Sequence, residues 1–258
     1  MPEPTPEETW RALLYGELRG LNRMRALFSR IPSSPRCKLC NAPFGAPGNH
    51  VLRLTGFGPS PINRRLCKVC IRSVHKDPGG AEVEVSVLIA DVRGSTRLAE
   101  TLPSAEYSRL IARYYGTVAR AVDDHDGLVD KFVGDGAVAL FIPGFAGAQH
   151  AAAAIAAAHD LLHATRDGDG RPWIPVGIGV DTGRSFVGTV GEGDALDFTA
   201  LGDPVNVAAR LSGVAQAGEL LVTEGAANAG GLTTDGLDRR VLELRGHEQP
   251  VAAWVVAA

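Results

Sequence analysis

The sequence predicts an α+β protein whose main domain has a ferredoxin-like core, and three patterns lead to that class. A β-branched apolar run at residues 83–90 is typical of a buried strand. Apolar residues then recur at helical spacing over 96–124. Two short strand patterns follow, 127–132 and 137–142, on either side of a Val-Gly-Asp-Gly sequence that favours a hairpin. With the later elements, the order is β-α-β-β-α-β, which predicts helices covering one face of an antiparallel sheet.

The second half of this domain continues the same alternation. An Ala-rich segment at 147–165 predicts a helix. A second helix is expected at 203–215, with Asp203 as its N-cap and Pro204 as its first residue. Strands are expected at 173–180 and 184–190, joined by a turn at 181–183, and then at 219–223, 240–244 and 251–256.

The charge of the chain divides unevenly along its length. The 258 residues carry a net charge of −3. Residues 1–78 hold 13 Lys and Arg against 5 Asp and Glu, whereas residues 79–258 hold 13 against 24. This split predicts a basic N-terminal module joined to an acidic domain. The expected parts are an N-terminal lead and amphipathic helix at 1–36, a four-cysteine module at 37–76, and the main domain at 81–258.

The basic module is expected to begin with a helix. Residues 1–8 are acidic and proline-rich and are expected to form a disordered lead. Apolar residues at helical spacing then predict one amphipathic helix over about residues 9–30, weakened by Gly16 and Gly20 and ended by the prolines that follow. Residues 77–80, Asp-Pro-Gly-Gly, are typical of a linker to the acidic domain.

The composition excludes several classes of protein. Hydrophobic residues make up 45% of the chain and charged residues 21%, as in soluble globular proteins. The longest apolar stretch, 151–158, is far shorter than the roughly 20 residues of a membrane span. The N-terminus lacks the basic and apolar segments of a secretory signal. We therefore expect a cytoplasmic protein whose cysteines stay reduced.

All four cysteines lie in two Cys-x-x-Cys pairs of the basic module. The pairs are Cys37 with Cys40 and Cys67 with Cys70. Four thiolates at this spacing suit one tetrahedral ion, which predicts a structural Zn²⁺ site, while an iron–sulfur centre or redox thiols remain as alternatives. His50 and His75 are alternative ligands, although surface positions are more usual for such residues. A bound metal would explain how so Gly- and Pro-rich a segment folds.

Two carboxylates of the acidic domain suit a divalent cation. Asp91 ends the apolar run at 83–90, and Asp135 lies at the tip of the expected hairpin. An aspartate before glycine is usually a turn residue, so the prediction depends on the pair. If neighbouring strands bring both to one edge of the sheet, the carboxylates repel each other unless a cation lies between them. Carboxylate oxygens suit Mg²⁺ or Mn²⁺.

Two other segments suit a nucleotide. Residues 92–96 lead from a strand through Gly94 into a helix, whose N-terminus offers free N–H groups to phosphate. Asn206 and Arg210 lie four residues apart and share one helix face, where they can hold a ribose and a phosphate. Their spacing alone is more typical of a solvated polar face.

Three motifs, in this order, resemble the catalytic domain of the class III nucleotidyl cyclases. They are Leu-Ile-Ala-Asp-Val-Arg-Gly-Ser-Thr at 88–96, Asp-Lys-Phe-Val-Gly-Asp-Gly at 130–136, and Phe-Thr-Ala-Leu-Gly-Asp-Pro-Val-Asn-Val-Ala-Ala-Arg at 198–210. Each motif is moderately specific, and the resemblance rests on their order and spacing over roughly residues 83–256.

The resemblance implies a role for each matching position. The implied metal ligands are Asp91 and Asp135, the catalytic residues Asn206, Arg210 and Arg245, and the substrate-binding residues Lys131, Thr199, Val92, Arg93, Gly94, Ser95 and Thr96. Two positions depart from the usual family pattern. Thr199 stands where many members carry Asp, as in the branch reported to respond to bicarbonate, and Arg245 stands where Lys is usual.

The implied reaction converts ATP to 3′,5′-cyclic AMP and pyrophosphate, with two Mg²⁺ or Mn²⁺ ions per site. The metals assist attack of the ribose 3′-hydroxyl on the α-phosphate, and Arg210 stabilises the transferring group. Lys131 favours adenine, because its ammonium can donate to the adenine N1 acceptor, and it is the only lysine after residue 78 in a chain that prefers arginine. The alternatives are a guanylate cyclase, a catalytically silent nucleotide-binding sensor, and a zinc-ribbon protein that binds nucleic acid.

The resemblance also implies a homodimer with shared sites. One chain would supply Asp91 and Asp135, and the other would supply Lys131, Thr199, Asn206, Arg210 and Arg245. The partner expected for the basic module is the protein's own acidic domain, ahead of nucleic acid or a membrane surface.

Overall fold

The computed structural model describes residues 4–46, 48–52, 54–61, 64–193, 196–243 and 249–257. The chain divides into two compact units. The first comprises Met1–Val83 with Phe186–Ala200, and the second comprises Glu84–Ser185 with Leu201–Ala258. None of the described helices is long and apolar enough to cross a bilayer.

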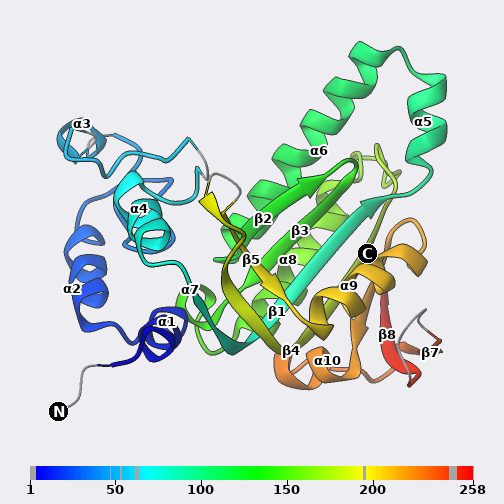
Figure 1. Ribbon diagram of the computed structural model, residues 1–258. Helices are drawn as coiled ribbons and strands as arrows, with labels where there is room; N and C mark the ends of the chain where they lie inside the picture. The colour runs from blue at the N-terminus through cyan, green and yellow to red at the C-terminus, as the bar shows by residue number, and fades with distance from the viewer. Residues whose placement is uncertain are drawn as a thin grey trace. The chain divides into compact units, whose positions relative to one another are not determined.

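A mixed sheet forms the centre of the second unit. Its strands are β1 (Gly80–Val92), β2 (Leu128–Val133), β3 (Gly136–Phe141), β4 (Val176–Val190), β6 (Glu219–Thr223), β7 (Asp238–Leu242) and β8 (Val251–Ala257). They run in the order β2-β3-β1-β4-β6-β8-β7 (Figure 1). The first four strands have the ferredoxin-like order, with β3 antiparallel to both β1 and β2, which confirms the predicted core. The strands appended to it begin with β6, which runs parallel to β4.

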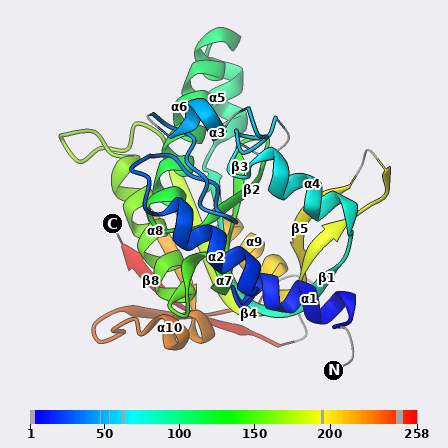
Figure 2. The same cartoon turned by 90° about the vertical axis from the view of Figure 1, so that its left-hand side faces the viewer.

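Long helices pack on one face of this core. The helices of the second unit are α5 (Ser95–Thr101), α6 (Ser104–Asp124), α7 (Pro143–Ala146), α8 (His150–Ala164), α9 (Asp203–Val214) and α10 (Glu224–Gly230). Tyr114 and Val118 of α6 and Leu161 of α8 are buried against Leu88 of β1 and Ile178 of β4. Figure 2 shows α6 and α8 from the side. The expected arrangement of helices on one face therefore holds for the βαββαβ core.

Helix α9 lies on the other face of the sheet. Its residues Val207 and Leu211 pack against Leu221 of β6, whereas Leu220 and Val222 of the same strand belong to the larger core. Because side chains alternate across a strand, α9 and the α6–α8 pair are on opposite faces. This helix makes the connection that lets β6 run parallel to β4.

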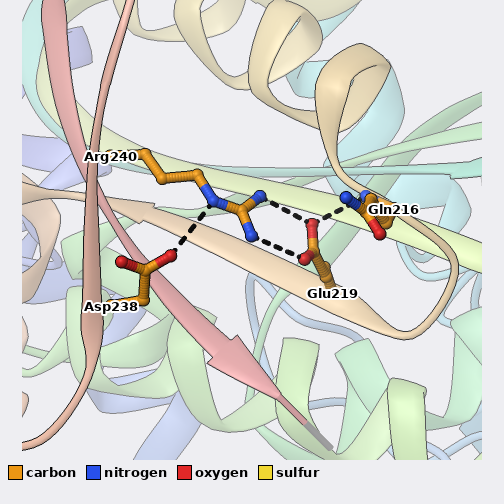
Figure 3. A network of polar contacts seen from close by, with 4 residues as sticks. All are labelled: Gln216, Glu219, Asp238 and Arg240. Atoms are coloured by element: carbon orange, nitrogen blue, oxygen red, sulfur yellow. Dashed lines mark hydrogen bonds and ion pairs between the residues drawn. The ribbon is translucent and has the colours of Figure 1, made fainter.

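A bidentate ion pair ties two of the appended strands together. Arg240 of β7 donates to both carboxylate oxygens of Glu219 on β6, at 2.9 and 3.0 Å, and its Nε donates to Asp238 at 3.3 Å (Figure 3). The backbone N–H of Gln216 also donates to Glu219, at 2.8 Å. These bonds lower the pKa of Glu219, first because Arg240 donates to its charged form.

Several expected elements differ from those observed. The turn expected at 181–183 is wrong, since β4 is one continuous strand. Asp181 accepts a hydrogen bond from Thr223 at 2.5 Å and Thr182 bonds Ser86 at 2.7 Å, so contacts with neighbouring strands hold this turn-like sequence extended. The helix expected over 96–124 is two helices, α5 and α6, because Pro103 interrupts it. Strand β5 (Asp197–Leu201), which pairs with β4, and the short helices α7 and α10 were not predicted.

The helical part of the first unit also differs from the expectation. It contains α1 (Pro6–Leu14), α2 (Arg19–Phe28), α3 (Asn49–Leu52) and α4 (Lys68–Lys76). The single helix expected over 9–30 is two helices, since Gly16 adopts a left-handed φ of 72° between them. The disordered lead expected at 1–8 is wrong for its last residues, because Thr5 and Glu8 form a capping box that starts α1 at Pro6.

Candidate functional site

The candidate catalytic edge of the second unit lies where β1 and the β2–β3 hairpin end together. The register of β1 with β3 pairs Asp91 with Gly136, the residue after Asp135. A Cβ atom built on Gly136 would lie 3.7 Å from Oδ1 of Asp91, so the Asp91 carboxylate lies beside the hairpin turn. The strand that neighbours β1 is β3 rather than β2, and the turn between β2 and β3 carries Asp135 to the same end as Asp91.

Arg93 places a positive charge at this acidic edge. Its guanidinium donates to the Asp91 carboxylate and, at 2.8 Å, to the carbonyl of Gly213 at the end of α9. Burial lowers the pKa of Arg93, and the charge of Asp135 opposes that shift. The carboxylates of Asp91 and Asp135 therefore both interact electrostatically with the Arg93 guanidinium. From the sequence, Arg93 was expected only in the phosphate-binding loop. Its contact with Asp91 depends on how that loop folds back, which the spacing of the residues does not show.

The donor set at this edge fits a divalent metal. It consists of two carboxylates, which are the hard ligands that Mg²⁺ and Mn²⁺ prefer. The Asp91 side chain is 37% exposed, so a hydrated ion can approach it. Arg93 already supplies a cation against the same carboxylate, which indicates that the pair requires positive charge.

Tyr115 of α6 supports the hairpin turn, and its neighbour Tyr114 is buried nearby. The hydroxyl of Tyr115 donates to the carbonyl of Gly134, and its ring stacks on Phe132 with centroids 3.9 Å apart. Tyr114 is fully buried, and burial raises its pKa, with the charge of Asp135 adding to the shift. Sequence reasoning placed both tyrosines in a helix but missed this support, because it depends on how α6 packs on the hairpin.

Lys131 lies on β2 just beyond an irregularity in the strand pairing. The register shifts between Val129 and Lys131. The Lys131 side chain is 38% exposed, and its Nζ lies 3.8 Å from Oδ2 of Asp130, whose own side chain is 2% exposed. The bulge is of the kind that re-aims a side chain near a functional site.

Asn206 and Arg210 share the outer face of α9. Asn206 is exposed and Arg210 is half-buried, while Val207 and Leu211 fill the inner face. The predicted N-cap is wrong by one residue: Gly202 is the N-cap, and Asp203 is the first residue of the helix. Asn206 and Arg210 thus face away from the sheet. A site on this face would need another group to complete it.

The remaining predicted residues fall in three places. Thr199 is buried in β5, in the first unit. In the loop after β1, Val92 is buried, and Gly94 caps α5 without a side-chain hydrogen bond, which leaves the first N–H groups of Ser95 and Thr96 without a capping side chain. Arg245 lies outside the described residues.

The four cysteines of the first unit converge on one point. Their Sγ atoms all lie within 4.8 Å of one another, and all four side chains are buried. Sγ of Cys40 is 3.7 Å from that of Cys67, and the backbone N–H of Cys67 donates to Sγ of Cys37 at 3.2 Å. Among the described residues, this group of potential metal ligands contains no histidine, and His75 lies outside it.

The four thiols shift one another's pKa values in opposite directions. Hydrogen bonds from the neighbouring thiols, that of Cys40 first, lower the pKa of Cys37. The pKa of Cys70 is raised, chiefly because its thiol donates to Cys37. Four thiolates cannot share so small a buried volume without a cation, so the arrangement fits a bound metal ion.

Comparison with known proteins identifies the family. A family model described as the adenylate and guanylate cyclase catalytic domain matches residues 80–257. The uncharacterized protein Rv1319c of Mycobacterium tuberculosis is 36% identical over 177 residues, covering 67% of this chain and 32% of the relative. Rv1318c, an uncharacterized protein of the same species, is 37% identical over 183 residues with the same coverage. The match thus spans about a third of the length of these curated relatives.

Solved structures of both cyclase types share the fold. The guanylyl cyclase Cya2 has a TM-score of 0.63 at 27% identity, covering 69% of this chain and 93% of that chain. The adenylyl cyclase CyaB from P. aeruginosa has a TM-score of 0.60 at 26% identity, covering 70% and 97%. Given the acidic edge, the ordered motifs and these matches, the chain belongs to the family of adenylate and guanylate cyclase catalytic domains.

Proposed function

We propose that the chain is an adenylate cyclase that converts ATP to 3′,5′-cyclic AMP and pyrophosphate. Two observations support cyclase activity. The strand register places Asp91 beside the turn that carries Asp135, and both residues lie in the segment that matches the cyclase family. The choice of ATP is supported by Lys131, a half-exposed ammonium on β2 that can donate to the N1 acceptor of adenine. The guanylyl cyclase Cya2 is about as similar to this chain as the adenylyl cyclase CyaB, so a guanylate cyclase is the second candidate.

The acidic edge would hold Mg²⁺ or Mn²⁺ through Asp91 and Asp135. When bound, these ions would lower the pKa of the ribose 3′-hydroxyl and neutralise the leaving pyrophosphate. For the carboxylates to bind metal, Arg93 would release Asp91, and its remaining bond to Gly213 would hold it at the site. Its guanidinium would then be free to contact a phosphate.

The other site residues would position the nucleotide. Lys131 and Thr199 would contact the purine, Asn206 would orient the ribose, and Arg210 would stabilise charge on the α-phosphoryl group. Arg245 would contact the triphosphate. Since Asn206 and Arg210 face away from the sheet of their own chain, we propose that a second copy supplies the acidic edge opposite them, giving a homodimer with two shared sites.

A direct assay of the full chain tests this function. Purified protein is incubated with ATP or GTP and Mn²⁺, and cyclic nucleotide is measured by chromatography. We expect cyclic AMP from ATP at a higher kcat/KM than cyclic GMP from GTP. Preference for GTP would make the protein a guanylate cyclase, and binding of nucleotide with no product from either would make it a silent sensor.

Replacement of Lys131 tests the basis of nucleotide choice. Lys131→Glu exchanges a donor for an acceptor, which suits the N1 donor of guanine, so we expect the ATP to GTP ratio of kcat/KM to fall by about 10-fold or more. Lys131→Arg keeps the charge but changes the shape of the donor, so it separates the effect of charge on the ratio from that of shape. An unchanged ratio in Lys131→Glu would remove Lys131 from purine recognition.

We also propose that the cysteine cluster holds one structural Zn²⁺. The four buried thiols within 4.8 Å of one another support it. Elemental analysis of the purified chain is expected to find one zinc per chain. Iron with visible absorption would instead indicate an iron–sulfur centre.

A further inference from the structure

Trp10 of α1 joins three parts of the first unit. Its side chain is buried, and its indole N–H donates to the backbone carbonyl of Asp77 at 3.2 Å. Its ring stacks on Phe198 of β5, with centroids 6.3 Å apart and planes 20° apart, within the range of an offset stack. Trp10 lies outside the segment that matches the cyclase family, whereas Phe198 lies inside it.

The strand that Trp10 contacts also carries Thr199. Successive side chains of a strand point to opposite faces. Phe198 turns one face of β5 toward the indole, and Thr199, which is 7% exposed, belongs to the other face. A shift of the Trp10 ring therefore acts on the backbone that positions Thr199.

A second connection holds β4, the strand that pairs with β5. The N–H of Gly79 donates to Oγ1 of Thr189 at 2.7 Å, and the N–H of Thr189 donates to the carbonyl of Gly79 at 2.7 Å. The approach is so close that a Cβ atom on Gly188 would lie 2.2 Å from that carbonyl oxygen. Thr189 is in β4, which pairs with β5, so residues 77–79 are attached to both strands through Trp10 and Thr189.

Helix α4 connects this attachment to the cysteine cluster. Cys67 is its N-cap, Cys70 lies in its first turn, and Asp77 is its C-cap. The apolar packing around the helix is incomplete, since a cavity of about 240 Å³ lies beside Trp10, Leu13 and Val74. Ile71 and Val74 of α4 are buried, but its N-terminal end is held by the two cysteines, so the metal that they bind would help to set the position of the helix.

We propose that Trp10 is a positioning residue that transmits the metal state of the cysteine cluster to β5, and so controls how well Thr199 meets the purine. The proposal rests on the proposed cyclase function for its catalytic readout. Loss of the metal loosens α4, the carbonyl of Asp77 moves from the indole, and the stack on Phe198 that holds β5 weakens.

The kinetic test replaces Trp10 in the full, metal-loaded chain. We expect Trp10→Ala to raise KM for ATP by about 3- to 10-fold and to reduce the preference for ATP over GTP, with a smaller change in kcat. Trp10→Phe keeps a ring but loses the donor, so an intermediate effect is expected. Trp173→Phe is the matched control, because Trp173 makes the same kind of indole bond, to the carbonyl of Ala164 at 2.9 Å, in the second unit.

The structural test does not need activity. Amide hydrogen exchange is measured across residues 186–200 with the metal bound and after chelation, with metal loss checked by elemental analysis. We expect faster exchange in β5 on chelation, equally fast exchange in metal-loaded Trp10→Ala, and an intermediate rate in metal-loaded Trp10→Phe. Unchanged exchange in the chelated wild type would overturn the coupling even if the enzyme is active. Faster exchange in a protein that makes no cyclic nucleotide would retain the coupling and reject the cyclase function.

Discussion

Arg93 connects the acidic edge to two other parts of the second unit. It donates to Asp91 and to the carbonyl of Gly213, and its own backbone N–H donates to Pro175 at 2.8 Å. Removal of the Asp91 carboxylate would therefore affect both the metal and the position of this guanidinium. The acidic edge therefore combines two carboxylates with one guanidinium, which leaves a net charge of −1.

Asp91→Asn is expected to abolish most cyclase activity while the fold is kept. The amide keeps the shape of the side chain but removes a negative oxygen ligand, so we expect a loss of about 100-fold or more in kcat with Mn²⁺. The exposed Asp235, replaced by Asn, is the matched control. Full activity in Asp91→Asn would exclude this carboxylate as a metal ligand.

His150 is a buried histidine whose protonation opposes folding. Its Nδ1 lies 2.9 Å from the Ser86 hydroxyl and its Nε2 lies 3.5 Å from the Glu84 carboxylate. Burial lowers the pKa of His150 below 6.5, and Glu84 only partly opposes the shift. As pH falls through 6.5, the unfolded chain binds a proton that the folded chain resists, so stability falls.

We expect His150→Gln to flatten this pH dependence. Between pH 7 and the lowered pKa of His150, the wild type should lose up to about 1.4 kcal/mol of unfolding free energy per pH unit that the variant does not lose. Urea unfolding at several pH values measures the difference. His163→Gln, at an exposed position of α8, is the control variant. Equal slopes in wild type and His150→Gln would show that His150 does not titrate in this way.

At the scale of elements, the ion pair between β6 and β7 secures the far side of the sheet. Glu219 is only 15% exposed and accepts three hydrogen bonds, two from Arg240 and one from Gln216. Its pKa is lowered, so its contribution is present above pH 4.5 and is lost as pH falls through the folded pKa.

Glu219→Gln is expected to lower the free energy of unfolding by about 1–2 kcal/mol at pH 7, because a charged bidentate pair becomes a neutral contact. The difference in the free energy of unfolding between wild type and variant should disappear as pH falls toward 3. Chemical denaturation at both pH values measures it. Arg239→Gln on the exposed side of β7 is the control, and a gap that persists in acid would assign the effect to packing.

At the scale of the whole molecule, the placement of the site residues leads to a test of assembly. Asp91→Asn and Arg210→Ala are each expected to be inactive alone. In a mixed dimer, one site would combine intact Asp91 from one chain with intact Arg210 from the other. Random exchange of chains should therefore restore about a quarter of the wild-type activity.

Asp91→Asn mixed with Asp135→Asn is the control for that experiment. With shared sites, both changes would lie on the edge that one chain supplies, so every site in the mixture would stay defective. Restored activity in the control, or none in the first mixture, would contradict shared sites.

The sequence was sufficient wherever the signal was local. The apolar run before Asp91 and the Gly-Asp-Gly tip of the hairpin predicted strands that the structure contains, because alternation and a short turn are local signals. Prediction from the sequence failed where long-range contacts outweighed the local conformational preference. The Asp-Thr-Gly sequence at 181–183 is turn-like, yet bonds to Thr223 and Ser86 keep it in a strand.

The chemistry of this protein was determined by the sequence itself, because ligand types and their spacing are local: four cysteines in two pairs, two aspartates after strands, and an Asn and Arg on one helix face. Only the tertiary structure decided that Arg93 bonds the carbonyl of Gly213, that Tyr115 supports the hairpin, and that Trp10 stacks on Phe198. Those contacts join residues far apart in the chain. They follow from which buried surfaces fit together, and no spacing along the sequence encodes that fit.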